Sequence, residues 1–173
     1  MGLIESAAPP VVIARAADSE LLADRNSSVR LLLDATDTGG TISAHRVLLR
    51  DGAIGAEPHR HRLANEVFHV LDGVVDLLAG DQMLTATAGD LIVVPSKAAH
   101  AFGAAVGHDA ELLVLVTPGI DRFDFFRTVY RIRAGLESQT ALAEATHRYD
   151  NHPAPTGRWD AARSRNPSRK SKR

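Results

Sequence analysis

The chain has 173 residues, of which 45% are hydrophobic and 24% charged, and its formal net charge is -1. These values are typical of one globular domain with a real apolar core, and they exclude a wholly disordered chain. The sequence contains no cysteine, which excludes disulfide scaffolds, thiolate-held metal clusters and thiol nucleophiles. Any metal must therefore be held by histidine and carboxylate side chains.

Short apolar segments occupy the first two thirds of the chain and predict β-strands. They are rich in Val, Ile, Leu and Thr and are separated by Gly, Asp or Pro. The pair Asp72-Gly73 is typical of a hairpin, because type I′ turns need residues that tolerate positive φ. So many short strands predict an antiparallel barrel or sandwich. The predicted strands are 11–15, 29–34, 42–50, 67–71, 74–79, 82–87, 91–94, 99–104 and 111–117.

The pattern changes to helical spacing after Pro118. Aromatic and aliphatic residues recur every three or four positions over 121–137, with Asp121 as a plausible cap, and a second helix is predicted over 138–148. The first of these helices carries aromatic residues on more than one face. We expect it to pack on the barrel, either over the barrel mouth or as a simple cover for one sheet face.

The C-terminal segment differs in composition from the rest. Residues 158–173 hold seven basic side chains and one acidic one, with hardly any large apolar residue after Trp159. Such a segment cannot bury enough surface to order itself, so 151–173 is predicted to be a disordered basic tail. A nucleic-acid-binding arm is the alternative, limited to non-specific contacts because no aromatic residues are interleaved for base stacking.

The sequence contains no apolar run long enough to predict a membrane-spanning helix. The longest apolar runs are far shorter than the roughly 20 residues that a spanning helix needs. The N-terminus also lacks a basic start followed by a continuous apolar run. We therefore expect a cytoplasmic protein.

Three histidines and one glutamate form the main candidate site. His59 and His61 point to the same face if they lie on a strand, and a short turn returns Glu66 beside them. His100 lies on a later strand, after Pro95. Imidazole and carboxylate together suit one divalent transition metal, namely Fe, Ni, Mn, Cu, Co or Zn. Four protein ligands leave a coordination position open, which is typical of a reactive metal rather than a structural one.

Strand alternation also predicts which neighbours face the candidate site. Phe68 shares the inward parity of Glu66, and Phe102 shares that of His100, so both are expected in a substrate pocket. His45 is a third pocket candidate, on a strand whose register the sequence does not fix. His69 alternates outward and is expected to be a structural or interface residue, not a ligand.

The spacing of the first cluster resembles a motif of the cupin superfamily. That motif places H-x-H, three or four residues, Glu, six residues and Gly in succession, and His59, His61, Glu66 and Gly73 match it. The upstream Gly of the family pattern has no counterpart at the right distance, because Gly52 lies one residue too far away.

The second family motif is matched in part. Gly89, Pro95 and His100 stand at the family spacing, whereas Lys97 replaces a Gly and Ala104 replaces an Asn. These departures concern turn geometry and one polar position, not the ligand, so the turn after Pro95 is expected to differ from the family pattern.

The resemblance implies an all-β fold, a double-stranded β-helix or jelly-roll barrel, followed by C-terminal helices. It also implies a small-molecule substrate and a homodimer. The expected divisions are N-terminal strands packing on the barrel at 1–39, the barrel core at 40–118, the helical segment at 119–150 and the basic tail at 151–173.

Two kinds of chemistry follow from the resemblance. In quercetinase-like dioxygenases an enolisable or phenolic substrate chelates the metal, and Glu66 would be both ligand and proton acceptor. In non-redox members, such as isomerases and polyketide cyclases, the metal polarises a carbonyl as a Lewis acid. We expect dioxygenase-like chemistry first, Lewis-acid chemistry second and a non-catalytic binding module third.

Overall fold

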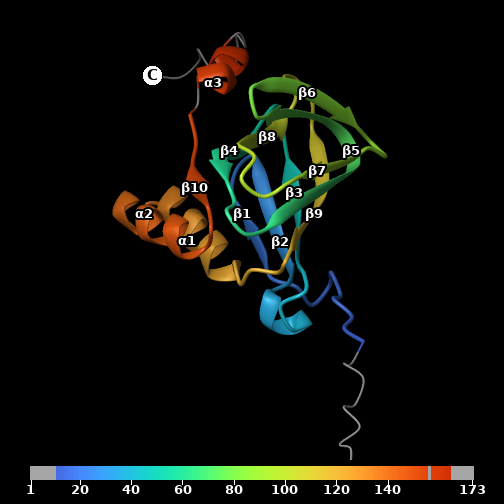
Figure 1. The fold of residues 1–173 in the computed structure, drawn as a ribbon, viewed down its shortest axis with the longest axis vertical. Coiled ribbons are helices and arrows are strands. Elements are labelled where there is room, and N and C mark those ends of the chain that lie inside the picture. The colour runs from blue at the N-terminus through green and yellow to red at the C-terminus, as the bar shows by residue number, and fades with distance from the viewer. Residues whose placement is uncertain (1–10, 156, 165–173) are drawn as a thin grey trace, which may run out of the picture.

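The computed structural model describes residues 11–155 and 157–164, and at 144–147 it describes the backbone alone. Ten of its elements are strands (Figure 1). Their bounds are β1 (Leu21–Ala23), β2 (Ser27–Leu33), β3 (Ser43–Leu49), β4 (Ile54–Arg60), β5 (Asn65–Ala79), β6 (Gln82–Thr87), β7 (Leu91–Val94), β8 (His100–Ala104), β9 (Ala110–Thr117) and β10 (His152–Pro153).

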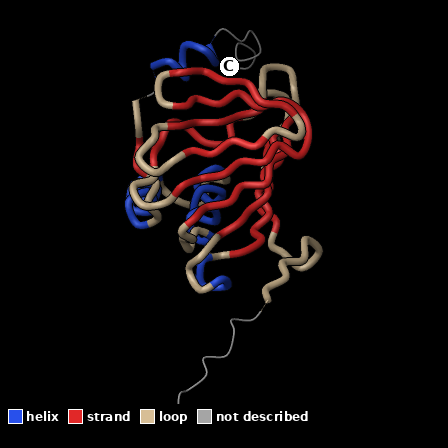
Figure 2. Tube along the Cα trace, turned by 45° about the vertical axis from the view of Figure 1, so that its right-hand side comes forward, coloured by secondary structure: helices blue, strands red, loops and turns tan. Residues whose placement is uncertain are grey.

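The helices lie at the periphery of the strands, as Figure 2 shows. Among the described residues, none of them is long and apolar enough to cross a membrane. Their bounds are η1 (Ala35–Thr38), a 3-10 helix, and the α-helices α1 (Phe123–Arg133), α2 (Gln139–Arg148) and α3 (Gly157–Ser164).

All paired strands are antiparallel and form one curled sheet, which confirms the all-β jelly-roll prediction with C-terminal helices. The strand order is β1-β2-β3-β9-β5-β8-β4-β10, and β6 and β7 also pair with β5. Burial alternates along the strands: on β9 Ala110, Leu112, Val114 and Val116 are buried and their neighbours are half-exposed. One face of each strand therefore fills the barrel interior.

The longest strand, β5, joins the two halves of the barrel. Its first half pairs with β7 and β9, and its second half pairs with β6 and β8. The predicted hairpin at Asp72-Gly73 is wrong, because β5 continues through it. The pairing register shifts between Val70 and Asp72, and Gly73 has a φ of 78°. A Cβ at Gly73 would collide with the carbonyl of Asp109, so glycine is needed at this corner.

The strand predictions also fail at residues 11–15, β1 and β4. Residues 11–15 form no strand, although they are apolar, because they have no strand to pair with. Conversely, the predicted strands omit β4, because Gly55 and Pro58 interrupt any alternating apolar pattern there, although the candidate site places His59 and His61 on a strand. The pairing of β4 with β8 and β10 holds it in the sheet despite that composition.

The start of α1 is fixed by a residue distant in sequence. The carboxylate of Asp34 accepts hydrogen bonds from the backbone N–H groups of Arg122 (2.7 Å) and Phe123 (3.3 Å). Asp121, the predicted cap, instead accepts the N–H of Thr36 (2.8 Å). This exchange ties the helix start to the segment after β2, and it satisfies helix N–H groups that have no partner within the helix.

The prediction of a disordered tail from 151 onward is wrong for the described residues. This stretch contains β10 and α3, and residues 165–173 lie outside the described residues. Trp159 on α3 is 1% exposed and packs against Leu78 and Ala101. Arg163 donates hydrogen bonds to the carbonyls of Ala104 (2.8 Å) and Gly52. A single buried indole and one satisfied guanidinium thus anchor a helix that composition alone does not predict.

Replacing Trp159 with Ala should lower the free energy of unfolding by about 3–5 kcal/mol, because it removes a large, fully buried side chain and leaves a cavity. Urea unfolding followed by circular dichroism measures the change. Arg158→Ala, an exposed neighbour on the same helix, is the control and should stay within about 0.5 kcal/mol of the parent. An equal effect of both variants would contradict the docked position of α3.

Candidate metal centre

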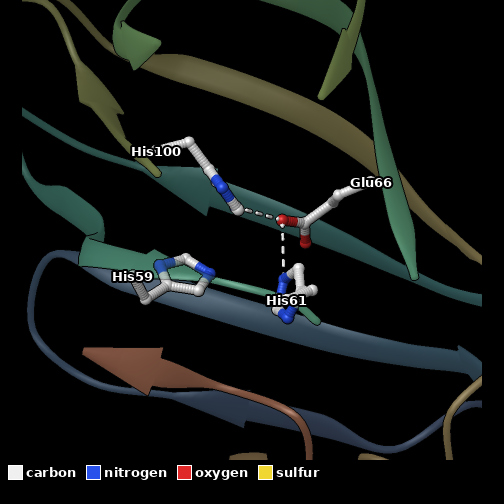
Figure 3. A group of neighbouring side chains, drawn as sticks. All are labelled: His59, His61, Glu66 and His100. Atoms are coloured by element: carbon white, nitrogen blue, oxygen red, sulfur yellow. Dashed lines mark hydrogen bonds and ion pairs between the residues drawn. The ribbon is translucent and has the colours of Figure 1, made fainter. Parts of the chain in front are cut away.

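The four predicted ligands converge at one buried point inside the barrel (Figure 3). His59 lies on β4, His61 directly after it, Glu66 on β5 and His100 at the start of β8. One nitrogen or oxygen from each lies within 4.8 Å of the others. All four side chains are buried. The arrangement is the one that the sequence spacing predicts.

Strand pairing explains this convergence. His59 is the cross-strand partner of His100 in the β4–β8 pair, and Glu66 is held between its partners on β7 and β9. The turn between β7 and β8 is hydrogen-bonded to the ligand segment, because the backbone N–H of Lys97 donates to the carbonyl of His61 (2.6 Å). Lys97 has a φ of 72°, a left-handed conformation that glycine adopts at lower cost. The turn therefore forms even without the glycine of the family pattern.

The outer nitrogen of each imidazole is fixed by the backbone. The Nδ1–H of His59 donates to the carbonyl of Glu57 (2.8 Å), that of His61 to Asp150 (2.6 Å) and that of His100 to Ala98 (3.0 Å). Carbonyl oxygens only accept, so each Nδ1 must carry the proton. In a neutral imidazole the other nitrogen, Nε2, then presents its lone pair toward the centre.

The donor set fits a metal cation. Oε2 of Glu66 lies 2.7 Å from Nε2 of His100 and 3.2 Å from Nε2 of His61. A lone pair facing a carboxylate oxygen at this distance requires positive charge between or on the groups. A single divalent cation would satisfy all four atoms, and histidines whose second nitrogen is hydrogen-bonded to a carbonyl are the usual arrangement around a metal. His59, His61, Glu66 and His100 are the residues that would hold it.

Burial and mutual contact set the ionisation of this cluster. Burial alone would raise the pKa of Glu66, but its contacts with His100 and His61 bring that pKa well below the ordinary value. Burial, and next the neighbouring His100, lower the pKa of His59 well below its ordinary value. The carboxylate is therefore ionised and the His59 ring neutral at neutral pH, which are the forms that bind metals.

Asp150 supports the cluster and was missed by the sequence analysis. Its carbonyl accepts the Nδ1–H of His61, and its carboxylate accepts the N–H groups of Arg62 (2.8 Å) and Leu63 (2.9 Å). Burial would raise the pKa of Asp150, but these hydrogen bonds lower it. Since β10 pairs with β4, residues after α2 return to the site from far along the chain, which no local pattern reveals.

A cavity of about 400 Å³ opens beside the cluster, between the barrel and the terminal helices. His59 and Glu66 line it, as do two of the three predicted pocket residues, His45 and Phe102. Phe68 does not. It is fully buried behind Phe102, with ring centroids 5.0 Å apart, because its inward side chain meets the core before it reaches the cavity. The α1 helix forms much of the opposite wall, through Phe125, Phe126, Val129, Tyr130, Ile132 and Arg133.

Two polar groups in this cavity stand beside the four ligands. The ring of His45 contacts that of Phe126 (centroids 4.6 Å apart), and burial, reinforced by the charge of Arg122, lowers the pKa of His45 to about 3. Arg122 is 5% exposed and its Nη1 lies 3.8 Å from Oε1 of Glu66. The sequence analysis missed Arg122, because nothing local distinguishes it from the exposed arginines of α1.

Comparison with known proteins identifies the fold family. A family model described as a cupin domain matches residues 45–116. This match confirms the resemblance to the cupin superfamily. No match was found among curated proteins.

Three solved structures illustrate the fold. KdgF from Halomonas sp. is 17% identical with a TM-score of 0.56, covering 67% of this chain and 99% of its own. An RmlC-like cupin from Shewanella frigidimarina is 19% identical with a TM-score of 0.54, covering 67% and 96%. The polyketide cyclase RemF from Streptomyces resistomycificus is 19% identical with a TM-score of 0.53, covering 63% and 80%. At these identities the likeness concerns the fold.

Replacing His61 or Glu66 with Ala should abolish tight metal retention. Each change removes a direct ligand, so the loss of affinity should exceed the roughly 10–100-fold that loss of an outer hydrogen-bond partner costs. Elemental analysis per chain after dialysis measures retention, and circular dichroism checks the fold. His108→Ala, at an exposed histidine, is the matched control. If both ligand variants kept full metal, the assignment of this centre would be wrong.

The buried neutral His45 should make the fold sensitive to acid. Its pKa of about 3 in the folded protein lies below the unfolded value of 6.5, so the unfolded chain binds more protons and stability falls as the pH drops below about 7. Between pH 7 and pH 5 this group should account for about 2 kcal/mol of the decrease in unfolding free energy.

His45→Gln, which cannot titrate, should reduce the loss of stability between pH 7 and pH 5 by that amount in chemical denaturation. His108→Gln provides the comparison, because His108 is exposed. An identical acid-induced loss in His45→Gln and the parent would show that His45 is not held neutral in the fold.

Proposed function

We propose that this protein is a metal-dependent enzyme that binds a small enolisable or phenolic substrate through oxygen. The observation that carries the proposal is the cluster of three histidines and one glutamate at the wall of an apolar cavity. A bound divalent metal would supply Lewis acidity and, for a redox-active ion, electron transfer to dioxygen. A structural metal has no need of an adjacent cavity of this size.

The cavity supports a planar, mainly apolar substrate. Phe102, Phe126 and Tyr130 line it, and His59 and Glu66 of the cluster form part of its wall. One carboxylate and neutral imidazoles would leave a divalent ion with excess positive charge in these surroundings. Such a site favours an anionic oxygen ligand, for example an enolate or a phenolate.

Glu66 fits the role of ligand better than the predicted second role of proton acceptor. Its pKa lies well below the ordinary value because of its contacts with His100 and His61. A carboxylate of low pKa is a weak base, and efficient proton transfer needs a pKa near the working pH. A substrate that is already acidic, such as a phenol or a β-diketone, needs the least help from such a residue.

For the reaction itself, dioxygenase-like chemistry of the quercetinase type is the first candidate, with incorporation of dioxygen into the enolate or phenolate. Lewis-acid chemistry without dioxygen is the second candidate. It is favoured by one observation, that a similar fold occurs in RemF, which is named a polyketide cyclase.

Oxygen uptake separates the two candidates. The protein, freed of metal and reloaded with Fe, Mn, Ni, Co, Cu or Zn in turn, is incubated with flavonols, β-diketones and other enolisable compounds, and oxygen and substrate are followed together. Metal-dependent loss of both supports the dioxygenase. Metal-dependent substrate loss that continues without oxygen supports the Lewis-acid enzyme.

The metal-ligand variant His61→Ala and the exposed-histidine control His108→Ala make the experiment specific to the site. Turnover should vanish in the first and persist in the second. Absence of turnover with every metal and compound class, in protein shown to hold metal, would contradict an enzymatic function and leave a binding module.

A further inference from the structure

Arg122 is a buried cation without hydrogen-bond partners for two of its nitrogens. It is 5% exposed and lines the cavity. Its Nε and Nη1 are buried and donate no hydrogen bond to any of the described residues. The nearest carboxylate oxygen, Oε1 of Glu66, lies 3.8 Å from Nη1, too far for a hydrogen bond. A buried guanidinium in this state is costly unless something else completes its contacts.

The other acids near Arg122 are engaged elsewhere. The carboxylate of Asp34 accepts the N–H groups of Arg122 and Phe123, and that of Asp150 accepts the N–H groups of Arg62 and Leu63. Burial lowers the pKa of Arg122. The negative charges of Asp34 and Asp150 act against this effect, but neither carboxylate is hydrogen-bonded to the guanidinium. The edge of the guanidinium therefore lacks an acceptor within the described protein.

The guanidinium is nevertheless held in a fixed place. Its central carbon lies 5.5 Å from the ring centroids of both Phe125 and Phe126. Its backbone N–H is held by Asp34 at the start of α1. Aromatic contacts occupy the faces of a guanidinium, whereas its edge matches a carboxylate with two parallel hydrogen bonds.

The charge balance points to the same ligand. The charged residues that line the cavity are two acidic ones, Glu57 and Glu66, and two basic ones, Arg122 and Arg133. Their charges cancel, so a divalent metal held by the cluster would leave two positive charges uncompensated. His45 is neutral at neutral pH and adds no charge. In an apolar cavity, such a surplus favours a substrate with more than one anionic oxygen.

We propose that Arg122 anchors the substrate, and that the substrate is an aromatic carboxylic acid with a hydroxyl or oxo group beside the carboxylate. The carboxylate binds the edge of Arg122, and the neighbouring oxygen faces His59 and Glu66. Nη1 of Arg122 lies 3.8 Å from Oε1 of Glu66, so the groups that would bind the carboxylate and the neighbouring oxygen are adjacent. The aromatic ring of the substrate would contact the aromatic side chains of the cavity wall. This inference rests on the proposed function for the role of the second oxygen, whereas the carboxylate contact needs Arg122 alone.

A matched pair of probes tests the carboxylate contact. Salicylate and salicylamide have nearly the same shape and differ in the charge of one group. Binding of each to metal-free protein is measured by calorimetry or by NMR titration. Salicylate should bind at least about tenfold more tightly than salicylamide, because charge-assisted hydrogen bonds to a buried guanidinium are among the strong ones.

Variants assign that preference to one residue. Arg122→Gln should remove the preference for the acid, and Arg122→Lys, which keeps the charge but not the planar edge, should retain part of it. Arg127→Gln changes an arginine of α1 that pairs with Glu20 and Asp124 at the surface, and this variant should bind both probes as the parent does. Thermal unfolding of each variant checks the fold.

Several outcomes would overturn the inference. The parent protein could bind salicylate and salicylamide equally, or bind no probe at all. Arg122→Gln could keep the full preference for salicylate. The parent could also bind phenyl phosphate more tightly than salicylate. The first and last need no variant, so the test survives misfolding of Arg122→Gln. The binding test uses metal-free protein, so its outcome does not depend on the proposed function. If the proposed function alone is wrong, the protein will prefer salicylate through Arg122 but will neither retain metal nor turn over substrate.

Discussion

The whole site depends on three hydrogen bonds from imidazole Nδ1–H groups to backbone carbonyls. These bonds involve His59, His61 and His100, and they leave the three Nε2 atoms directed toward one place in the barrel. Without that constraint, each ring could turn its lone pair outward, and the carboxylate of Glu66 would be a buried charge without support. The donor set is thus built by the backbone before any cation arrives, which lowers the ordering cost of binding.

Two of these carbonyls are local in sequence and one is distant. Glu57 and Ala98 lie two residues before the histidines they hold, whereas Asp150 comes from the segment after the last long helix. The same segment continues into β10 and α3, and α3 is fixed by Trp159 and Arg163. One C-terminal segment therefore contacts both the candidate metal centre, through Asp150, and the barrel strands under α3. Its docking links the stability of the barrel to the geometry of the centre.

How much the sequence predicts depends on the range of the interactions. The spacing of His59, His61, Glu66 and His100 is local to strands, so alternation and the family resemblance suffice to bring them together. Gly73 shows the limit, because Asp72-Gly73 has the local chemistry of a hairpin, and only pairing with strands on both sides turns it into a bend within β5. Arg122 and Asp150 were missed for the same reason: their roles arise from contacts across 56 and 89 residues of sequence, respectively.

The central claim is that this barrel holds one divalent transition metal through these four side chains. The most direct test is elemental analysis of the unmodified protein, purified without added metal or chelator and again after reconstitution. The account predicts about one Fe, Ni, Mn, Cu, Co or Zn per chain, as expected for one cluster of three histidines and a glutamate. A folded protein that retains no transition metal, even after reconstitution, would contradict it.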